Sequence, residues 1–406
     1  MPYRRVLAVA LGGIGDVLMA EPAVRLLRQE AGLERLGVLA HGHAGPLLGP
    51  WSRTERLFAW DASEYRGPVG QLRLMRDLRR ERFEAALCLW PSSSLKCVLI
   101  PVLAGVPVRF IHAYRQGHGR YLARVAARRA PYRPAAHRVE RNVDLVAGAL
   151  RVPPAAGAPL GLNGLDGPAT GEPGPLRPRL FLAPQDRLAA RALLETLGRD
   201  PGRPLVALHP GCTPAREALR RRWPMESFAR LAEDLTLRSG VQILLVAGPG
   251  EREEAAAFAE AMAAQAALAR GLAVPSLMLA GCRDLRTVAA ALAEADLVVS
   301  NDSGIGHLAA AVGTTVVSLF GPTAPAEVRP FGGGPVVTSP LECSPCIADL
   351  RPGPRRCDAP CMRAIRPETV FEKIAGLLAS RQRREQATGT RQQATGVVNG
   401  IISAAS

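Results

Sequence analysis

The sequence predicts an α/β fold of two Rossmann-like domains, whose parallel sheets face each other across a cleft. The chain of 406 residues is too long for one ordinary core, and its apolar fraction of 48% is that of a globular protein. Short apolar runs alternate with helical patterns in both halves, which indicates parallel strands joined by right-handed crossovers. Residues 152–178 are rich in Pro, Gly and Ala and lack any period, so they separate the halves as a linker or a long surface excursion.

The first half begins with a strand and an amphipathic helix. Residues 4–10, "RRVLAVA", are rich in β-branched residues and predict a strand, and residues 16–30 carry apolar side chains at the three–four spacing of a helix. Strands and helices continue to alternate behind them, with strands expected at 35–40, 84–90 and 106–111 and helices at 68–81, 94–104 and 136–151.

The second half repeats this organisation. Strands are expected at 204–208, 241–246, 276–279, 296–299 and 315–319, and helices at 224–239, 250–270, 284–294, 303–312 and 367–380. We therefore divide the chain into a first domain, a linker, a second domain, a C-terminal helix and a tail, at residues 1–165, 166–180, 181–365, 366–380 and 381–406. The tail repeats "QATG" and has no core pattern, which is typical of disorder.

The chain is strongly basic, with a net charge of +15 and a pI near 10.4. Only Lys96 and Lys373 are lysines, and the arginines are spread through every segment without a concentrated basic arm. This distribution favours acidic small ligands or an anionic membrane surface over nucleic acid. No apolar run reaches the ~18 residues of a membrane span. Glycines interrupt the apolar start of the chain, which favours a strand and turn of a mature cytoplasmic protein over a signal peptide.

The turn after the first strand, "ALGGIGDVLMAEP", predicts an anion site. Gly12 and Gly13 let backbone N–H groups approach a ligand, and the following helix N-terminus favours negative charge. It is not a dinucleotide fingerprint, because Leu18 stands where a third glycine would be required. Asp16 has two interpretations that the sequence leaves open: an N-cap of the helix, or a carboxylate aimed into the cleft.

Two turns of the second half also follow strands. In the first, Thr213 is a candidate phosphate donor, and Arg221 and Arg222 are candidates to neutralise the phosphate, although a solvated basic loop is the alternative. In the second, Glu251 opens a helix after "GPG", where it either favours the helix dipole or accepts hydrogen bonds from a sugar diol.

The stretch "SNDSGIGH" at residues 300–307 is the most informative turn. Ser303 and Gly304 offer hydroxyl and amide donors at a helix N-terminus, which suits a diphosphate. His307 lies one turn further on and shares that helix face. We interpret the histidine as functional in this setting, although an isolated histidine is more often structural.

Four of the eight cysteines form a cluster with metal-like spacing: Cys343, Cys346, Cys357 and Cys361. This spacing permits a tetrahedral thiolate site for zinc or iron. Such a site would be structural, since four thiolates leave no open position for catalysis.

These stretches resemble the glycosyltransferase family 9 heptosyltransferases of lipopolysaccharide assembly. The resemblance is carried by "GGIGDVLMAEPAVRLLR", "HPG…RRWPMESFARLA", "VAGPGERE", "SNDSG-x-x-H" with "LFGPT", and "SPLECSPC…CMRAIRPETVFEKI", which span residues 4 to about 376. It implies a GT-B fold and an inverting transfer that needs no catalytic metal or cofactor. It also implies a nucleotide-sugar donor, usually ADP-heptose, and an anionic lipid-linked glycan acceptor at the inner membrane surface.

The resemblance implies a role for each matching residue. Asp16 matches the proposed base in the acceptor-binding first domain, and Thr213 and Glu251 match contacts to the donor phosphate and nucleotide ribose in the second domain. The donor loop matches at Asp302, Ser303, Gly304 and His307. The family often has a lysine shortly before Trp-Pro, where this chain has Arg221 or Arg222, and the loop from 212 to 222 is longer than usual.

A non-catalytic nucleotide-sugar-binding or metal-binding module is the rival interpretation, because it would keep the donor loop without needing Asp16. A dehydrogenase is disfavoured by the failed fingerprint. The GT-B resemblance further predicts that the helix over 367–380 crosses back onto the first domain. Its apolar stripe needs a partner surface, and its members are Val370, Phe371, Ile374, Leu377 and Leu378. The cysteine cluster is expected in one loop before this helix.

Overall fold

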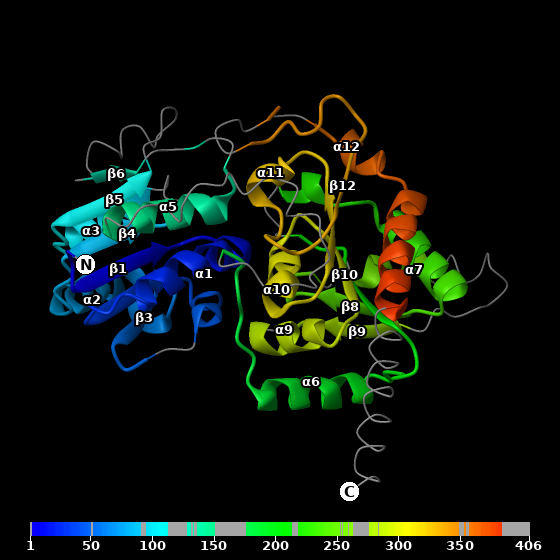
Figure 1. Cartoon of the computed structure of the whole chain (residues 1–406), viewed down its shortest axis with the longest axis horizontal. Coiled ribbons are helices and arrows are strands. Elements are labelled where there is room, and N and C mark those ends of the chain that lie inside the picture. Colours follow the sequence, from blue (N-terminus) through cyan, green and yellow to red (C-terminus); the bar gives the residue numbers. More distant parts are fainter. Residues whose placement is uncertain are drawn as a thin grey trace, which may run out of the picture.

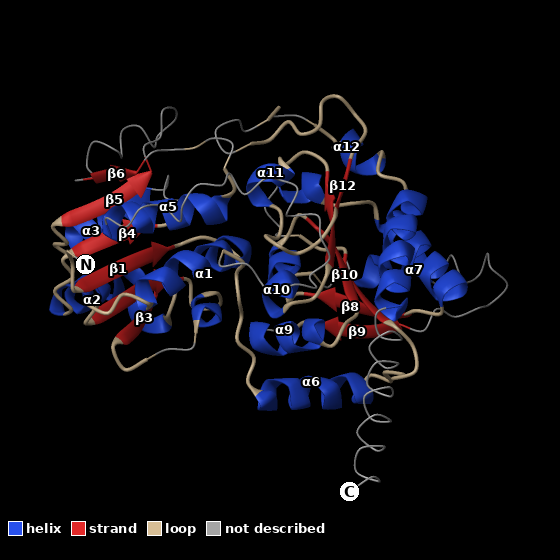
Figure 2. Cartoon of the chain, in the orientation of Figure 1, coloured by secondary structure: helices blue, strands red, loops and turns tan. Residues whose placement is uncertain are grey.

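Two parallel β-sheets, each covered by helices on both faces, make up the protein (Figures 1 and 2). The computed structural model describes residues 2–49, 52–90, 95–112, 128–130, 133, 136–150, 176–212, 218–251, 253, 255–258, 260–262, 276–282, 284–348, 353–354 and 357–383. The statements below refer to these residues.

The first sheet has the strand order β3-β2-β1-β4-β5-β6, and every neighbouring pair is parallel. Its strands are β1 (Arg5–Ala10), β2 (Arg35–Ala40), β3 (Glu55–Ala59), β4 (Ala85–Cys88), β5 (Val108–His112) and β6 (Arg128–Ala130). Residues from α1 (Ile14–Arg28) and α5 (Arg138–Leu150) complete the core on one face, and residues from α2 (Gly67–Arg80) and α3 (Leu95–Leu103) complete it on the other.

The second sheet has the order β12-β11-β10-β7-β8-β9 and is also parallel throughout. Its strands are β7 (Leu205–His209), β8 (Gln242–Ala247), β9 (Ser276–Ala280), β10 (Leu297–Asn301), β11 (Val316–Phe320) and β12 (Val336–Thr338). One face carries α6 (Pro184–Thr196), α9 (Leu285–Ala293) and α10 (Gly304–Val312), and the other carries α7 (Met225–Ser239). Two short helices, α11 (Pro325–Val328) and α12 (Pro360–Arg363), complete this half.

Both sheets share one topology. If the strands of each half are counted from its own start, both orders become 3-2-1-4-5-6, the doubly wound arrangement. The chain reverses direction across the sheet between the first and fourth strands, which are β1 and β4 in the first half and β7 and β10 in the second. Ligands of open parallel sheets bind beyond the carboxyl ends of these strands. The fold therefore offers one such position in each domain.

The two domains contact each other through α1 and α10. Leu18 and Leu47 of the first half join an apolar cluster with Leu308 of α10, and all three are buried. A second contact lies at His137, whose Nε2 is 2.8 Å from the carbonyl oxygen of Arg329. These contacts bring the carboxyl edge of the first sheet to the N-terminus of α10.

The C-terminal helix corrects one prediction. The helix at 367–383 packs on the second domain beside α7 (orange-red in Figure 1), and not on the first domain as expected. Val370, Phe371, Ile374 and Leu378 are buried in the same cluster as Trp223 and Phe228, and Leu377 is partly buried against it. The stripe did need a partner surface, but its spacing carries no information about which domain supplies that surface.

Most predicted elements are present, with bounds within a few residues. The helix expected over 250–270 is helical at its described positions between 253 and 262, and the rest lies outside the described residues. Most of the linker at 166–180 and nearly all of the tail lie outside them as well. No helix in the described part of the chain is long and apolar enough to cross a bilayer.

Candidate active site

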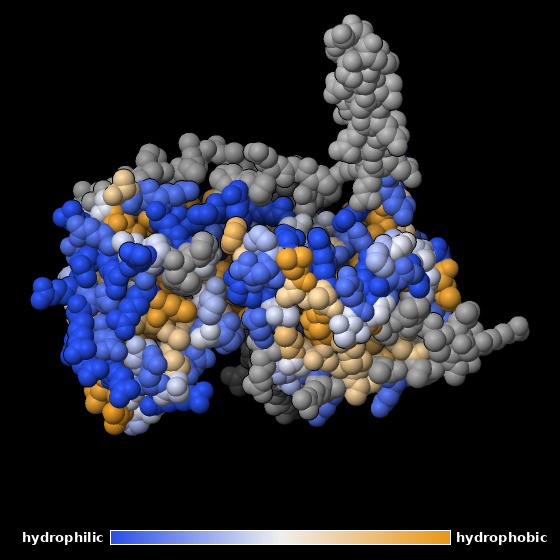
Figure 3. Space-filling view, turned by 90° about the horizontal axis from the view of Figure 1, so that it is seen from below, coloured by the Kyte–Doolittle hydropathy of each residue, from blue (hydrophilic) through white to orange (hydrophobic). Residues whose placement is uncertain are grey.

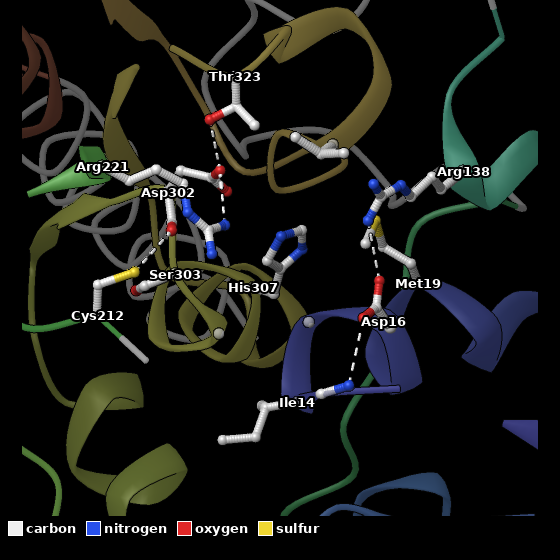
Figure 4. A pocket seen from close by; sticks show the side chains of 14 residues that line it. Ile14, Asp16, Met19, Arg138, Cys212, Arg221, Asp302, Ser303, His307 and Thr323 are labelled. Atoms are coloured by element: carbon white, nitrogen blue, oxygen red, sulfur yellow. Dashed lines mark hydrogen bonds and ion pairs between the residues drawn. The ribbon is translucent and has the colours of Figure 1, made fainter. Parts of the chain in front are cut away.

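A pocket lies between the two domains, at the carboxyl edges of both sheets (Figure 4). From the first domain it is lined by Gly13, Ile14, Gly15, Asp16, Met19 and Arg138. From the second domain it is lined by Cys212, Arg221, Asp302, Ser303, Gly304, His307, Thr323 and Val328. The turns after β1, β7 and β10 all contribute, so the pocket occupies the position that the doubly wound topology predicts.

Two helix N-termini meet at this pocket. Helix α1 follows its N-cap Gly13, and α10 follows its N-cap Ser303. The approach is close, because a Cβ atom at Gly304 would lie 2.9 Å from Ile14 Cβ, and one at Gly15 would lie 2.8 Å from the His307 ring. Each N-terminus carries unpaired N–H groups and a partial positive charge. Their convergence makes the pocket suitable for an anion such as a diphosphate.

Asp16 lies in the first turn of α1 and faces the pocket. Its Oδ2 accepts a hydrogen bond from the Gly13 N–H at 3.2 Å, and its Oδ1 accepts one from Arg138 Nη1 at 3.0 Å. The side chain keeps 22% of its surface exposed. The N-cap interpretation is therefore wrong in position, since Gly13 is the N-cap. Asp16 is the third residue of the helix, and its hydrogen bond with the N-cap N–H is one of the two bonds of a capping box. The carboxylate also lines the pocket. Gly12 leaves room for this turn, because a Cβ there would collide with Asp16.

Arg138 is a pocket residue that the sequence analysis missed. It comes from the first turn of α5, and its guanidinium lies 5.5 Å from the centre of the Trp90 ring. Arg138 thus places a cation beside Asp16, with the ring of Trp90 on the other side. The same helix is fixed by Asn142, whose side-chain oxygen accepts a hydrogen bond from the backbone N–H of Trp90 at 2.7 Å.

On the second domain, Asp302 organises the pocket wall. Its Oδ2 is 3.0 Å from Arg221 Nη1 and accepts a hydrogen bond from the Thr323 hydroxyl at 2.7 Å. Asp302 is buried, so this pairing satisfies a carboxylate that would otherwise be costly to desolvate. Of the two arginine candidates, Arg221 lines the pocket, whereas Arg222 lies outside the lining and donates to the carbonyl of Cys212 at 3.0 Å.

His307 lies between the two groups of charges, as Figure 4 shows. The ring is buried, and burial lowers its pKa because desolvation disfavours the imidazolium form. The carboxylates of Asp302 and Asp16 oppose this shift in part. A histidine with a lowered pKa is mostly neutral at pH 7, although a hydrogen bond between the ring and the Val328 backbone also opposes the shift. The Ser303 hydroxyl nearby is 2.9 Å from the hydroxyl of Ser300.

Glu251 lies beside the pocket and does not line it. Its Oε2 accepts a hydrogen bond from the Gly248 N–H at 2.6 Å, and its Oε1 is 3.8 Å from Nε2 of the buried His209. It packs against Gly211, where a Cβ atom would collide with the carboxylate. This places Glu251 next to the turn that carries Cys212 into the pocket. Thr213, predicted in the same turn, lies outside the described residues.

The predicted cysteine cluster lies between β12 and the C-terminal helix. Cys343 is exposed, Cys361 is buried, and the other two are intermediate. Burial raises the pKa of the Cys361 thiol, and the nearby thiols of Cys346, Cys343 and Cys357 raise it further. Within the described ranges, however, no three His, Cys, Asp or Glu side chains come close enough to hold a metal ion.

Comparison with known proteins identifies the family. A profile of glycosyltransferase family 9 (heptosyltransferase) matches residues 71–352. The chain belongs to glycosyltransferase family 9. The transferase is 26% identical over 331 residues to lipopolysaccharide heptosyltransferase 2 of Salmonella typhimurium, which covers 80% of this chain and 85% of the relative. It is 25% identical over 378 residues to lipooligosaccharide heptosyltransferase 2 of Haemophilus influenzae, covering 92% and 99%.

Solved structures confirm the GT-B fold. Escherichia coli ADP-heptose lipopolysaccharide heptosyltransferase II matches 93% of the transferase and 99% of its own chain, with a TM-score of 0.67 and 23% identity. A family 9 glycosyltransferase from Veillonella parvula matches 93% and 98%, with a TM-score of 0.70 and 18% identity. The resemblance, the fold class and the enzyme class predicted from the sequence are thus confirmed, and the non-catalytic rival is not supported.

Proposed function

We propose that this protein transfers a heptose from ADP-heptose to a lipopolysaccharide core acceptor, with inversion at the anomeric carbon. The names of its relatives support this donor and this acceptor. The observation that carries the chemistry is the position of Asp16, a partly exposed carboxylate facing a pocket formed by two helix N-termini.

The second domain would bind the donor. The N–H groups at the start of α10, the Arg221 guanidinium and the His307 ring all line the pocket and suit a diphosphate. These groups would stabilise the charge that develops as the nucleoside diphosphate leaves, which replaces the need for a metal ion. Glu251 beside the pocket is proposed to accept hydrogen bonds from the ribose diol, and Thr213 to contact the phosphate.

The first domain would bind the acceptor, with Asp16 as the general base. The acceptor hydroxyl oxygen attacks the anomeric carbon from the face opposite the diphosphate, and its proton passes to Asp16. The bond from the anomeric carbon to the phosphate oxygen breaks, and the nucleoside diphosphate leaves with the electron pair. Hydrogen bonds from Gly13 and Arg138 fix the orientation of the carboxylate, and each oxygen keeps a lone pair for the proton.

Nucleotide release tests the proposed substrates. The purified protein is incubated with a panel of ADP-, UDP- and GDP-sugars, with and without lipid-linked core acceptors that carry no heptose or one heptose. We expect acceptor-dependent release of ADP from ADP-heptose. Turnover of another nucleotide-sugar in place of ADP-heptose would overturn the proposed donor, and release from no donor would contradict the proposed reaction.

A lipid-linked acceptor implies where the protein acts. We propose that it is cytoplasmic and works as a peripheral protein on the inner membrane surface, with no nucleic-acid partner. The strongly basic composition supports an anionic surface of this kind.

A structural zinc or iron ion at the four cysteines is a separate proposal. Its support is the spacing of the cysteines along the chain, together with the influence of the other three thiols on the pKa of Cys361. Purified protein would then contain roughly one metal ion per chain, since four thiolates complete one tetrahedral shell. The variant Cys357→Ser, which lacks one of the four thiolates, is the control and should contain less metal. If the parent contained as little metal as this variant after gentle purification, the proposal would be contradicted.

A further inference from the structure

Helix α2 exposes a stripe of aliphatic and basic side chains on the first domain. Val69 is 74% exposed and Leu72 is 71% exposed, and these are the highest values among the large apolar residues of the described surface. Arg73, Arg76 and Arg80 continue the stripe at the spacing of one helix face, and all three are exposed. We call these five residues the α2 face.

The opposite side of α2 accounts for its folding. Leu74 and Leu78 are buried in the core of the first domain, so the helix is held without help from the α2 face. Val69 and Leu72 are therefore not required by the core, and leaving them in water is a cost unless another surface covers them.

Helix α2 itself carries four arginines and a single acidic residue. Asp77 is the one acidic residue of α2, and it lies 3.3 Å from Arg76 and 3.8 Å from Arg80. Arg79 extends the basic region toward α3, where it donates to the carbonyl of Leu103 at 2.7 Å. Leu103 is itself 54% exposed and adds an apolar group beside these arginines. The described surface of the first domain is otherwise mostly hydrophilic in the view of Figure 3.

The position of the helix links this surface to the pocket. Helix α2 follows β3, so its N-terminal end lies at the carboxyl edge of the first sheet, which is the edge that carries Asp16. Val69 and Leu72 are in the first two turns of the helix, and the arginines follow away from that edge. The apolar end of the α2 face thus lies toward the carboxyl edge of the first sheet.

We propose that the α2 face docks the protein on an anionic lipid bilayer, with Val69 and Leu72 inserted between headgroups and the arginines paired with lipid phosphates. The combination of a basic stripe and aliphatic side chains on one helix face is typical of helices that lie in a membrane interface. The inference rests on the proposed function for its setting, since a lipid-linked acceptor would then reach the cleft from the bilayer.

Vesicle co-sedimentation of the full chain tests this proposal without any transfer reaction. We expect binding to phosphatidylcholine vesicles that contain about one third phosphatidylglycerol, much weaker binding to pure phosphatidylcholine, and loss of binding at high salt. The triple variant Arg73→Gln/Arg76→Gln/Arg80→Gln should bind on the order of 100-fold more weakly, at about fivefold for each arginine near an anionic membrane. Val69→Ser/Leu72→Ser should weaken binding at least about tenfold.

Helix α6 provides a matched control. Leu188 is 65% exposed there and lies between Arg187 and Arg191, which both pair with Glu294. Helix α6 also has as many acidic residues as arginines, whereas α2 has four arginines and one aspartate. The variant Arg187→Gln/Leu188→Ser/Arg191→Gln should bind vesicles like the parent. Unchanged binding by both α2 variants, or an equal loss in the α6 variant, would overturn the proposal.

Two further measurements separate the possible failures. If size-exclusion chromatography shows that the α2 variants dissociate a dimer, then a second copy covers the α2 face and the membrane proposal is wrong. Transfer to a soluble, delipidated acceptor should be unchanged in the α2 variants, because these residues lie outside the pocket. If the parent protein transferred sugar but did not bind vesicles, only the docking proposal would be refuted. If the parent protein did not transfer sugar at all, the proposed function would be refuted.

Discussion

Replacing Gly304 by alanine tests how closely the two domains approach each other. A Cβ atom at this position would lie 2.9 Å from Ile14 Cβ, whereas ordinary contacts begin near 3.4 Å. The atom that it meets is attached directly to the α1 backbone, so a change of side-chain rotamer cannot relieve the contact. The N-termini of α1 and α10 must separate by about 0.5 Å, from 2.9 to 3.4 Å. Overpacking of this kind costs ~1–3 kcal/mol of stability.

Although Gly304→Ala adds only one methyl group, it should reduce turnover strongly. Alanine keeps the backbone N–H, so any loss reports on geometry and not on a missing donor. Displacement of reacting groups on the ångström scale can cost on the order of 100-fold in rate. We expect Gly304→Ala to lower kcat by roughly tenfold to 100-fold and to lower the melting temperature.

Gly306→Ala on the same helix is the control for this experiment. Its Cβ atom would meet Pro330 Cγ at 3.4 Å, which is an ordinary contact. This variant should keep its turnover within a few fold, and the better helix propensity of alanine should slightly favour its stability. If Gly304→Ala kept the parent's turnover and melting temperature, then the domains would not meet as described.

Three other changes probe the site and the core. His307→Ala should weaken donor binding by ~1.5–3 kcal/mol and also slow transfer, because it removes a hydrogen bond to a charged group. Calorimetry with a nucleotide-sugar measures the binding loss, and unchanged donor affinity would contradict the proposed role of His307. Burial lowers the pKa of His112 to about 4, so its neutral form stabilises the fold above pH ~6.5, and this stability is lost as the pH falls toward 4. Chemical denaturation should show about 2 kcal/mol less stability from this group at pH 5 than at pH 7, and the drop should be smaller in His112→Gln. Phe371→Ala should destabilise the second domain by ~3–5 kcal/mol, and an unchanged unfolding curve would show that the C-terminal helix is not part of that core.

The strands could be predicted from the sequence where they are buried on both faces. The run at 35–40 coincides with β2, because a strand inside a parallel sheet is apolar throughout and ends where the apolar run ends. Three of the four edge strands in the described part of the chain, β3, β6 and β12, were missed, whereas the fourth, β9, was expected at 276–279. In β3 only Phe58 is fully buried, and β12 has three residues after a glycine-rich turn, so neither gives a clear apolar run.

The turns that carry the pocket could also be predicted, since glycines and a capping residue directly after a strand are typical of a turn that opens a helix. Asp16, Asp302, Ser303, Gly304 and His307 all line the pocket as the motifs suggested. Arg138, by contrast, has no local signal in the sequence.

Arg138 is one arginine among many at the start of a helix, and Thr323 ends the "LFGPT" motif after a separate strand, without being predicted as a pocket residue. Only the tertiary fold brings them to the carboxylates. The partner of the C-terminal helix was unpredictable for the same reason, because an apolar stripe does not specify the surface that it contacts.

The central claim is that Asp16 acts as the base from the first domain while the second domain binds the donor. Asp16→Asn keeps the size of the side chain and an oxygen for the Gly13 N–H, but it removes the proton acceptor. The most direct measurement is therefore the donor dissociation constant and the turnover of this variant, measured side by side with the parent. We expect an unchanged dissociation constant with turnover lowered by a factor on the order of 10² to 10⁴, the range of a lost general base. A weakened donor with turnover preserved at saturation would contradict the claim and would place Asp16 in the donor site.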